Sequence, residues 1–238
     1  MRDVLFLPLS SEEELVIATD CSGGIGLKEA DLVKVPYEIV SYYGARVALM
    51  ELMSVGAVPL AFVLQNFVGD QEWKRLLQGI DQALAELHLS LPITGSTESN
   101  MSMLQSAAGF MAVGKVNKAN KRVGITPLQA KFAVIGEPFV GADVIKNQDR
   151  VLPLPLFQQL LTLPGIYEIV PIGSKGIFHE LKGLMEINGF APREVFCSLP
   201  LYASSGPATS VLVSYCPESE GQIKKAVGDY FFSINLKS

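Results

Sequence analysis

The stretch VIATDCSGGIGLKEADLVKVP, residues 16–36, joins a short apolar run to a glycine-rich polar segment. The run LVIAT, residues 15–19, contains β-branched residues and predicts a buried β-strand. The segment DCSGGIGLKEAD predicts a loop, because three glycines within four positions are unfavourable inside a helix or strand. Asp20 is therefore expected at the end of a strand, with Lys28 and Asp31 further along the loop.

The 238-residue chain carries a formal net charge of −5 and is 49% hydrophobic. This length allows one large domain or two small ones. A negative chain gives no indication of a nucleic-acid partner. No apolar run reaches membrane-spanning length, and the N-terminal run VLFLPL is too short for a signal peptide and lacks a cleavage site. We expect a cytoplasmic protein with neither a nucleic-acid nor a membrane partner.

The three cysteines, Cys21, Cys197 and Cys216, share no metal-ligand spacing. They fit a reduced compartment, where free thiols mostly act as small core residues. Cys21 is expected to be a buried structural thiol.

Strands and helices are expected to alternate along the chain, which indicates two α/β or α+β sub-domains. Strands are expected at 4–9, 15–19, 60–67, 91–93, 103–116, 131–138, 166–173 and 208–216, and helices within 36–55, 70–89, 155–163, 175–189 and 218–231. The polar, basic segment NKANKRVGITPLQ, residues 117–129, predicts a boundary. We therefore expect an N-terminal domain over 1–118 and a C-terminal domain over 129–238.

Three places hold polar residues that a fold would not need: the loop 20–31, Glu51 within an apolar helix, and TGSTESN at 94–100. Carboxylates beside glycines suit Mg²⁺ and nucleotide phosphates. Each also has a structural interpretation. Asp20 could cap its own backbone, Glu51 could face solvent, and TGSTESN could be a Ser/Thr turn that satisfies its own backbone. SGGIG is neither a Walker loop nor the dinucleotide fingerprint.

Taken together, these segments resemble a superfamily that includes aminoimidazole ribonucleotide synthase, thiamine monophosphate kinase, selenophosphate synthetase and hydrogenase maturation factors. VIATDCSGGIG resembles its strand ending in a metal-binding aspartate. GARVALMELMSVGAVP, residues 44–59, is similar to its signature helix, with Glu51 five residues before Gly56. TGSTESN stands where the family carries GGDT or GGET. The resemblance implies an α+β fold of two sub-domains, with helices packed on mixed sheets. It also implies a homodimer formed through the N-terminal strands, with ATP and magnesium bound near the dimer interface.

The strongest resemblance is to the α-ribazole kinase branch. DCSGGIGLKEAD, RVALMEL, GSTESN, PIGSKGI and SSGPAT match its motifs in order. The branch implies an ATP- and magnesium-dependent kinase that phosphorylates a small nucleoside, α-ribazole, in cobalamin lower-loop salvage. Two departures separate the chain from the ordinary thiamine monophosphate kinases: Ser96 replaces the aspartate of GGDT, and IGSKGI replaces a DxSDGL segment. Relative to the α-ribazole kinase branch, Ser99 replaces one acid of GSTEEN, and Ser204 replaces the lysine before SAGPAT.

The resemblance also implies roles for particular residues. Lys28 would neutralise the transferring phosphate, and Glu98 would act as the base or orient the acceptor hydroxyl. The implied metal ligands are Asp20, Asp31, Glu51 and Glu98. The implied nucleotide-binding residues are Asp20, Ser22, Gly23, Gly24, Gly26, Lys28, Gly95, Ser96, Thr97 and Asn100. Asp20 and Asp31 should then lie on one side of a cleft that Glu51 faces, with Glu98 and Asn100 pointing in.

Two other functions fit the same residues. One is an ATP-dependent cyclase or ligase acting on a ribonucleotide. The other is a non-catalytic nucleotide-binding protein, which the acids missing at Ser96 and in IGSKGI favour. Whichever function holds, we expect the chain to form a homodimer through its N-terminal half. VLFLPL and LVIAT are more apolar than one small sheet would cover, and an exposed apolar edge strand promotes aggregation.

Overall fold

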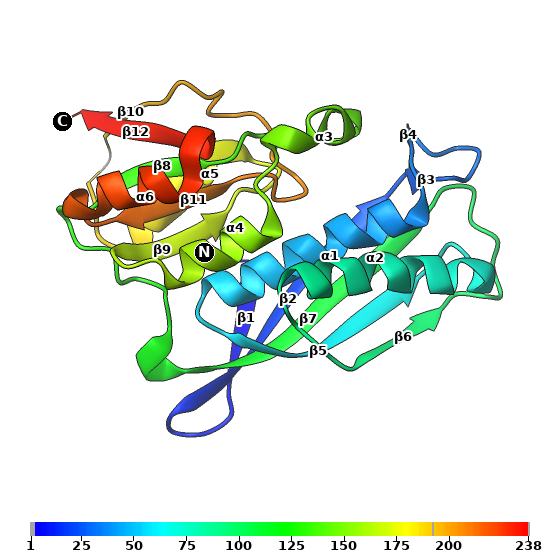
Figure 1. The fold of residues 1–238 in the computed structure, drawn as a ribbon. Coiled ribbons are helices and arrows are strands. Elements are labelled where there is room, and N and C mark those ends of the chain that lie inside the picture. Colours follow the sequence, from blue (N-terminus) through cyan, green and yellow to red (C-terminus); the bar gives the residue numbers. More distant parts are fainter. Residues whose placement is uncertain (1–2, 192, 238) are drawn as a thin grey trace. The chain divides into compact units, whose positions relative to one another are not determined.

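The computed structural model describes residues 3–191 and 193–237 (Figure 1). The chain divides into two compact units, one over Asp3–Asn120 and the other from Lys121 onward. Each unit is a five-stranded sheet with helices packed on it, so the predicted α+β fold class is confirmed. No helix within the described residues has the length and apolarity needed to cross a membrane.

The sheet of the N-terminal unit has the strand order β1-β2-β7-β5-β6. Its strands are β1 (Val4–Pro8), β2 (Glu13–Gly23), β5 (Val58–Asn66), β6 (Ile93–Thr97) and β7 (Ala107–Asn117). The pair β5–β6 is parallel and the other neighbours are antiparallel, so the sheet is mixed. A separate parallel pair, β3 (Ile25–Gly26) with β4 (Val33–Lys34), lies inside the glycine-rich segment.

Two helices, α1 (Tyr37–Ser54) and α2 (Trp73–Glu86), cover one face of this sheet (Figure 1). Because side chains alternate along a strand, Val16, Ala18 and Phe110 point into the core under α1. Gly44 lets α1 approach closely, since a Cβ there would stand 2.1 Å from the Phe110 ring. No helix of this unit covers the opposite face of the sheet within the described residues.

Among the strand boundaries that differ from the sequence-based expectation, two change where predicted site residues lie. The strand expected to stop at residue 19 continues to Gly23, because β7 offers partners as far as Ala107. The strand expected to stop at Ile93 runs to Thr97, because it pairs in parallel with β5 as far as Asn66. Asp20 and the residues 94–97 therefore lie within strands and not in loops.

The C-terminal unit has an antiparallel sheet of order β10-β12-β8-β11-β9. Its strands are β8 (Lys131–Ile135), β9 (Ile166–Pro171), β10 (Glu194–Phe196), β11 (Val211–Tyr215) and β12 (Phe231–Lys237). Its helices are α3 (Ala142–Lys146), α4 (Leu154–Thr162), α5 (Gly176–Ile187) and α6 (Glu220–Val227). The helix expected over 218–231 ends earlier, and the sequence analysis missed β10 and β12.

A buried carboxylate holds the first residues of the C-terminal unit against its sheet. Glu168 on β9 is 1% exposed and accepts hydrogen bonds from the backbone N–H groups of Gly124, Ile125 and Thr126. The Thr126 hydroxyl and the Asn188 amide add two more, at 2.7 and 2.8 Å. Because every one of these donors lies between 124 and 188, the segment after residue 121 is fixed within its own unit.

Candidate functional site

Three strands of the N-terminal sheet end at the same edge. β2, β5 and β6 run in one direction, and the pairing places Ser22, Ala108, Asn66 and Thr97 in one row. The segments 24–36, 67–72 and 98–106 leave or enter the sheet at this edge, which we call the carboxyl edge. Open sheets tend to bind ligands where the carboxyl ends of strands meet.

The glycine-rich segment folds back on itself at the carboxyl edge. The Gly24 N–H donates to the Ser106 carbonyl at 2.8 Å, and the Gly24 carbonyl accepts from Leu32 at 2.7 Å. A Cβ on Gly26 would stand 2.5 Å from Ser106 Oγ and 2.6 Å from the Tyr37 ring. Gly26 is therefore required by packing, and Gly24 by its positive φ of 70°, whereas a Cβ on Gly23 would meet nothing within 4 Å.

Asp31 closes this segment as a latch. Its carboxylate accepts from Ser106 N–H at 2.7 Å, from Ser106 Oγ at 2.7 Å and from Lys28 N–H at 2.8 Å. Burial acts to raise the pKa of Asp31, but the hydrogen bonds from Ser106 and Lys28, with the nearby Lys34 charge, outweigh it and lower the pKa. Because its two oxygens already accept three hydrogen bonds, the Asp31 carboxylate stabilises the conformation of this loop.

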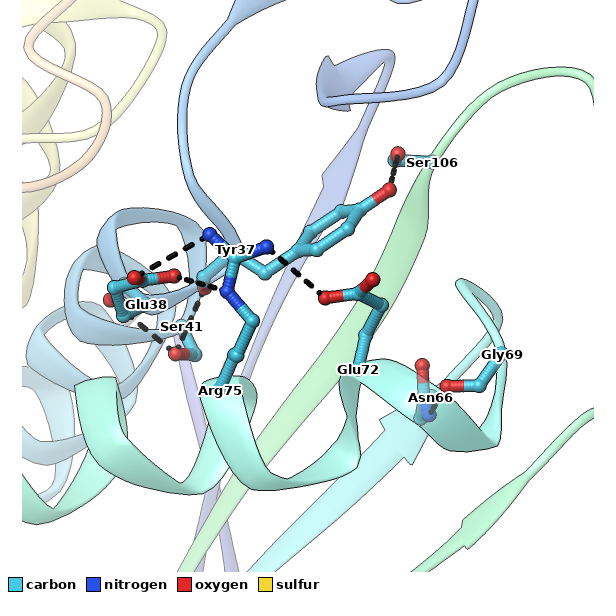
Figure 2. A network of polar contacts seen from close by, with 8 residues as sticks. All are labelled: Tyr37, Glu38, Ser41, Asn66, Gly69, Glu72, Arg75 and Ser106. Atoms are coloured by element: carbon cyan, nitrogen blue, oxygen red, sulfur yellow. Dashed lines mark hydrogen bonds and ion pairs between the residues drawn. The ribbon is translucent and has the colours of Figure 1, made fainter.

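Tyr37 and Ser106 extend this latch into α1. The Tyr37 hydroxyl lies 2.9 Å from Ser106 Oγ, and Figure 2 shows this hydrogen bond as a dashed line. Beside it, the Arg75 side chain forms ion pairs with Glu38 at 3.0 Å and Glu72 at 3.2 Å, which join α1 to the start of α2. The sequence analysis missed both Tyr37 and Ser106, because no spacing in the sequence indicates that they meet.

Lys28 lies between two loops of the carboxyl edge. Its Nζ donates to the Phe67 carbonyl at 3.1 Å. The Lys34 ammonium donates to the Glu29 carbonyl at 2.9 Å and also to the Lys28 carbonyl. An ammonium has three donors, so Lys28 keeps two that no acceptor in 3–191 or 193–237 takes up.

Asp20 stands on the helix-covered face of β2, opposite Phe110. Desolvation raises its pKa to about 6, although the backbone N–H of Cys21 acts in the opposite direction. An acid that is costly to ionise, at the edge of a sheet, would gain from a cation that takes over its lost hydration. The structural alternative of a backbone-capping loop residue does not describe its place within β2.

In the segment 94–100, some residues make packing or hydrogen-bond contacts and others are exposed to solvent. Gly95 is required by packing, because a Cβ there would stand 2.1 Å from the Leu64 carbonyl oxygen and 2.8 Å from the Trp73 ring. Thr97 Oγ1 accepts from the Asn66 amide at 3.0 Å, and the same amide donates to the Gly69 carbonyl at 2.9 Å (Figure 2 shows the Asn66–Gly69 contact). Ser96 is exposed.

Glu98 satisfies the backbone of its own loop. Its Oε1 accepts from the N–H of Asn100 at 2.7 Å and from that of Met101 at 3.0 Å, and these bonds lower its pKa. This is the self-satisfied turn that the sequence analysis considered as the alternative. The Asn100 backbone takes part in that turn, and its residue is exposed.

The four predicted metal ligands do not come together. The register places Asp20 opposite Phe110, while Asp31 binds Ser106, which directly precedes β7 and is four residues, or about 13 Å, before Phe110. Glu98 directly follows β6. On that strand, Gly95 lies in the row of Asp20 but three strands, or about 14 Å, away. Among the described residues no group of three or more acids, histidines or cysteines could hold a metal ion. The expectation of one four-acid site is therefore corrected.

Glu51 and Cys21 also lie elsewhere than expected. Glu51 is 8% exposed and adjoins Leu52, whose side chain lies over Gly114 in the row of Val16. That row is about 13 Å along β2 from Asp20, so Glu51 lies away from the carboxyl edge. Cys21 is exposed, because the strand continues past Asp20 and turns the thiol to the face without helices.

The family comparison agrees with this architecture. Residues 2–116 match the model of the AIR synthase related protein N-terminal domain. The chain belongs, through this N-terminal half, to the AIR synthase-related superfamily. No curated protein matches the sequence.

Solved structures extend the likeness over both units. Thiamine monophosphate kinase from Aquifex aeolicus superposes with a TM-score of 0.65 at 11% identity, covering 100% of this chain and 89% of that one. AaThiL complexed with AMPPCP and TMP gives 0.63 at 12%, covering 100% and 85%. T. maritima PurL complexed with ATP gives 0.61 at 11%, covering 97% of this chain and 41% of that one. At these identities the likeness shows the fold alone.

Proposed function

We propose that this protein is an ATP- and magnesium-dependent kinase that phosphorylates a small nucleoside, with α-ribazole as the acceptor. The single observation that carries the proposal is Asp20, a desolvated carboxylate with its pKa raised to about 6, within a strand of an AIR synthase-related domain. The identity of the acceptor is inferred from the five motifs shared with the α-ribazole kinase branch. AaThiL with AMPPCP and PurL with ATP support ATP as the donor.

Asp20 fits magnesium better than the other predicted ligands. Mg²⁺ is usually held by one or two carboxylates together with substrate phosphates and waters. Asp31 and Glu98 spend carboxylate oxygens on their own loops, so Asp20 would be the principal protein ligand. Bound magnesium would neutralise charge on the phosphates during transfer.

The remaining groups of the carboxyl edge would bind the nucleotide. Lys28 has two free donors for phosphate oxygens. Gly23 faces open space, which lets a phosphate approach the backbone. Ser22, Ser96 and Thr97 offer hydroxyl groups along the same edge. The Asp31–Ser106 latch would hold this loop in shape, so that little entropy is lost when nucleotide binds.

The test is a phosphoryl-transfer assay with ATP, Mg²⁺ and a panel of nucleosides that includes α-ribazole, read by the mass increase of the acceptor. Wild-type protein should add one phosphoryl group to α-ribazole, and Asp20→Asn should lose this activity at saturating ATP. Asp81→Asn, an exposed acid on α2, is the matched control and should keep it. If no nucleoside gains mass, the kinase proposal fails.

The second candidate is a nucleotide-binding protein without transfer activity. It is favoured by Glu98, because the proposed catalytic carboxylate is engaged by the Asn100 and Met101 N–H groups. Such a protein would bind ATP with Mg²⁺ in a calorimeter yet leave both ATP and every nucleoside of the panel unchanged.

The homodimer belongs to the same proposal. On the face of the N-terminal sheet opposite α1, Leu5 is 53% and Leu7 is 40% exposed, and they stand beside Ile17 and Leu15 of β2. A second copy would cover these residues. Light scattering at micromolar concentration should give the dimer mass, and Leu5→Asp with Leu7→Asp should give monomer; a wild-type monomer would refute this part.

A further inference from the structure

An exposed aromatic pair stands on the C-terminal unit, on a segment with no part in the nucleotide edge. Tyr202 is 73% exposed, the largest exposed fraction of any aromatic side chain among the exposed hydrophobics of the described chain. Its ring centroid lies 5.4 Å from that of Phe178 on α5, with the two planes tilted by 45°. Aromatic side chains, tyrosine above all, are enriched where proteins bind ligands or partners.

The backbone under Tyr202 is held rigidly. The turn that carries it is closed by Ala203 N–H donating to the Pro200 carbonyl at 3.3 Å, and the Leu201 carbonyl accepts from Phe178 N–H at 2.9 Å. A Cβ on Gly176 would stand 2.9 Å from the Tyr202 carbonyl carbon. Glycine at the first residue of α5 therefore lets the turn seat directly on the helix.

The chain after Tyr202 is anchored by buried hydroxyl groups. Ser205 N–H donates to the Gly173 carbonyl at 3.1 Å, and Ser205 Oγ lies 2.8 Å from both Thr209 Oγ1 and Ser210 Oγ. Thr209 Oγ1 in turn donates to the Glu137 carbonyl at 2.8 Å. Because the backbone around Tyr202 is anchored, its side chain loses little further conformational entropy when a ligand stacks on it.

The positive charge of Lys175, near the aromatic pair, limits the class of ligand that the pair can bind. Lys175 immediately precedes α5, is exposed, and has no ion-pair partner among the described residues. A positively charged ring such as a thiazolium would be repelled there, whereas a neutral heteroaromatic ring would not. The pair therefore suits a planar, uncharged base.

We propose that Tyr202 and Phe178 form a stacking platform for the neutral heteroaromatic base of the acceptor nucleoside. The inference rests on the proposed function for the identity of the acceptor, and it assigns the base-recognition site to the C-terminal unit. Stacking on aromatic side chains accepts any planar base, so Lys175 adds the discrimination against cationic rings.

The test is calorimetric titration of full-length protein with α-ribazole, in the absence of ATP and Mg²⁺. Tyr202→Ala should raise the Kd by between about 5-fold and about 150-fold, the loss expected for one base–aromatic stacking contact. Tyr202→Phe keeps the ring and should bind within about 2-fold of wild type. Phe196→Ala removes another exposed aromatic of the same unit and should leave the Kd unchanged. Lys175→Glu should improve binding of thiamine, which carries the cationic thiazolium ring and no phosphate, relative to α-ribazole.

The outcomes separate this inference from the proposed function. Binding that depends on Tyr202 without phosphorylation supports the platform and removes the kinase. Phosphorylation of α-ribazole with an unchanged KM in Tyr202→Ala removes the platform and keeps the kinase. No binding of α-ribazole by the wild-type protein overturns the platform as well. An unchanged melting temperature in Tyr202→Ala checks that the variant is folded.

Discussion

Replacing Asp20 with asparagine should stabilise the protein in the absence of ligands while abolishing its response to magnesium and ATP. The folded-state pKa is raised by burial from 3.8 to about 6. Folding therefore favours the protonated acid. The stability that this group contributes is fully present below pH 3.8 and is lost as the pH rises through about 6. At pH 7.5 the ionised carboxylate costs stability, and the neutral amide of asparagine removes that cost.

The size of the effect follows from the shift. About two pKa units correspond to about 3 kcal/mol. The side chain is only partly buried, so solvent screening reduces this to about 1–2 kcal/mol. For a chain of this size the melting temperature should rise by about 2–8 °C. The gain should shrink at pH 5, where wild-type Asp20 is mostly protonated.

Differential scanning fluorimetry at pH 5.0 and 7.5, with and without MgATP, measures all of these effects. Wild-type protein should gain stability from MgATP at pH 7.5, and Asp20→Asn should not. Asp31→Asn is the opposing control, because it removes acceptors that the loop needs and should lower the melting temperature at both pH values. A destabilised Asp20→Asn, or one that still responds fully to MgATP, would refute the reasoning.

Three further substitutions test individual contacts. Glu98→Gln keeps an Oε1 acceptor for its loop, so thermal unfolding should be unchanged while phosphoryl transfer to α-ribazole is lost; wild-type turnover would remove Glu98 from catalysis. Gly44→Ala would place a Cβ against the Phe110 ring and should cost about 1–3 kcal/mol in denaturant unfolding, with Gly221→Ala, which meets nothing within 4 Å, as the control. Glu168→Leu strands the five donors that its carboxylate now satisfies and should cost about 3–5 kcal/mol; a loss below 1 kcal/mol would mean that water replaces the carboxylate.

Much of the architecture could be predicted from the sequence, because it depends on local patterns. Short apolar runs with β-branched residues predicted the strands, and the amphipathic spacing in 70–89 predicted α2. Patterns failed where pairing decided the outcome. β2 and β6 each extend past their apolar cores because a neighbouring strand offers backbone partners there. In the C-terminal unit, the short strand β10 pairs with the final strand β12, and β12 pairs with β8, so both depend on partners that are distant in sequence.

For the candidate site, too, the sequence predicted some features and the tertiary structure decided others. The sequence alone determined that Asp20, the glycines and Lys28 occur together, since they are neighbours in the chain. Only the tertiary structure decided their roles, because Ser106 comes from a distant position to donate hydrogen bonds to Asp31, and Leu64 and Trp73 pack where a side chain on Gly95 would stand. The balance of burial and hydrogen bonding likewise distinguishes Asp20 from Asp31. Burial acts to raise the pKa of both carboxyl groups, but only at Asp31 do hydrogen bonds from Ser106 and Lys28 outweigh it, and these contacts depend on the fold and not on neighbours in sequence.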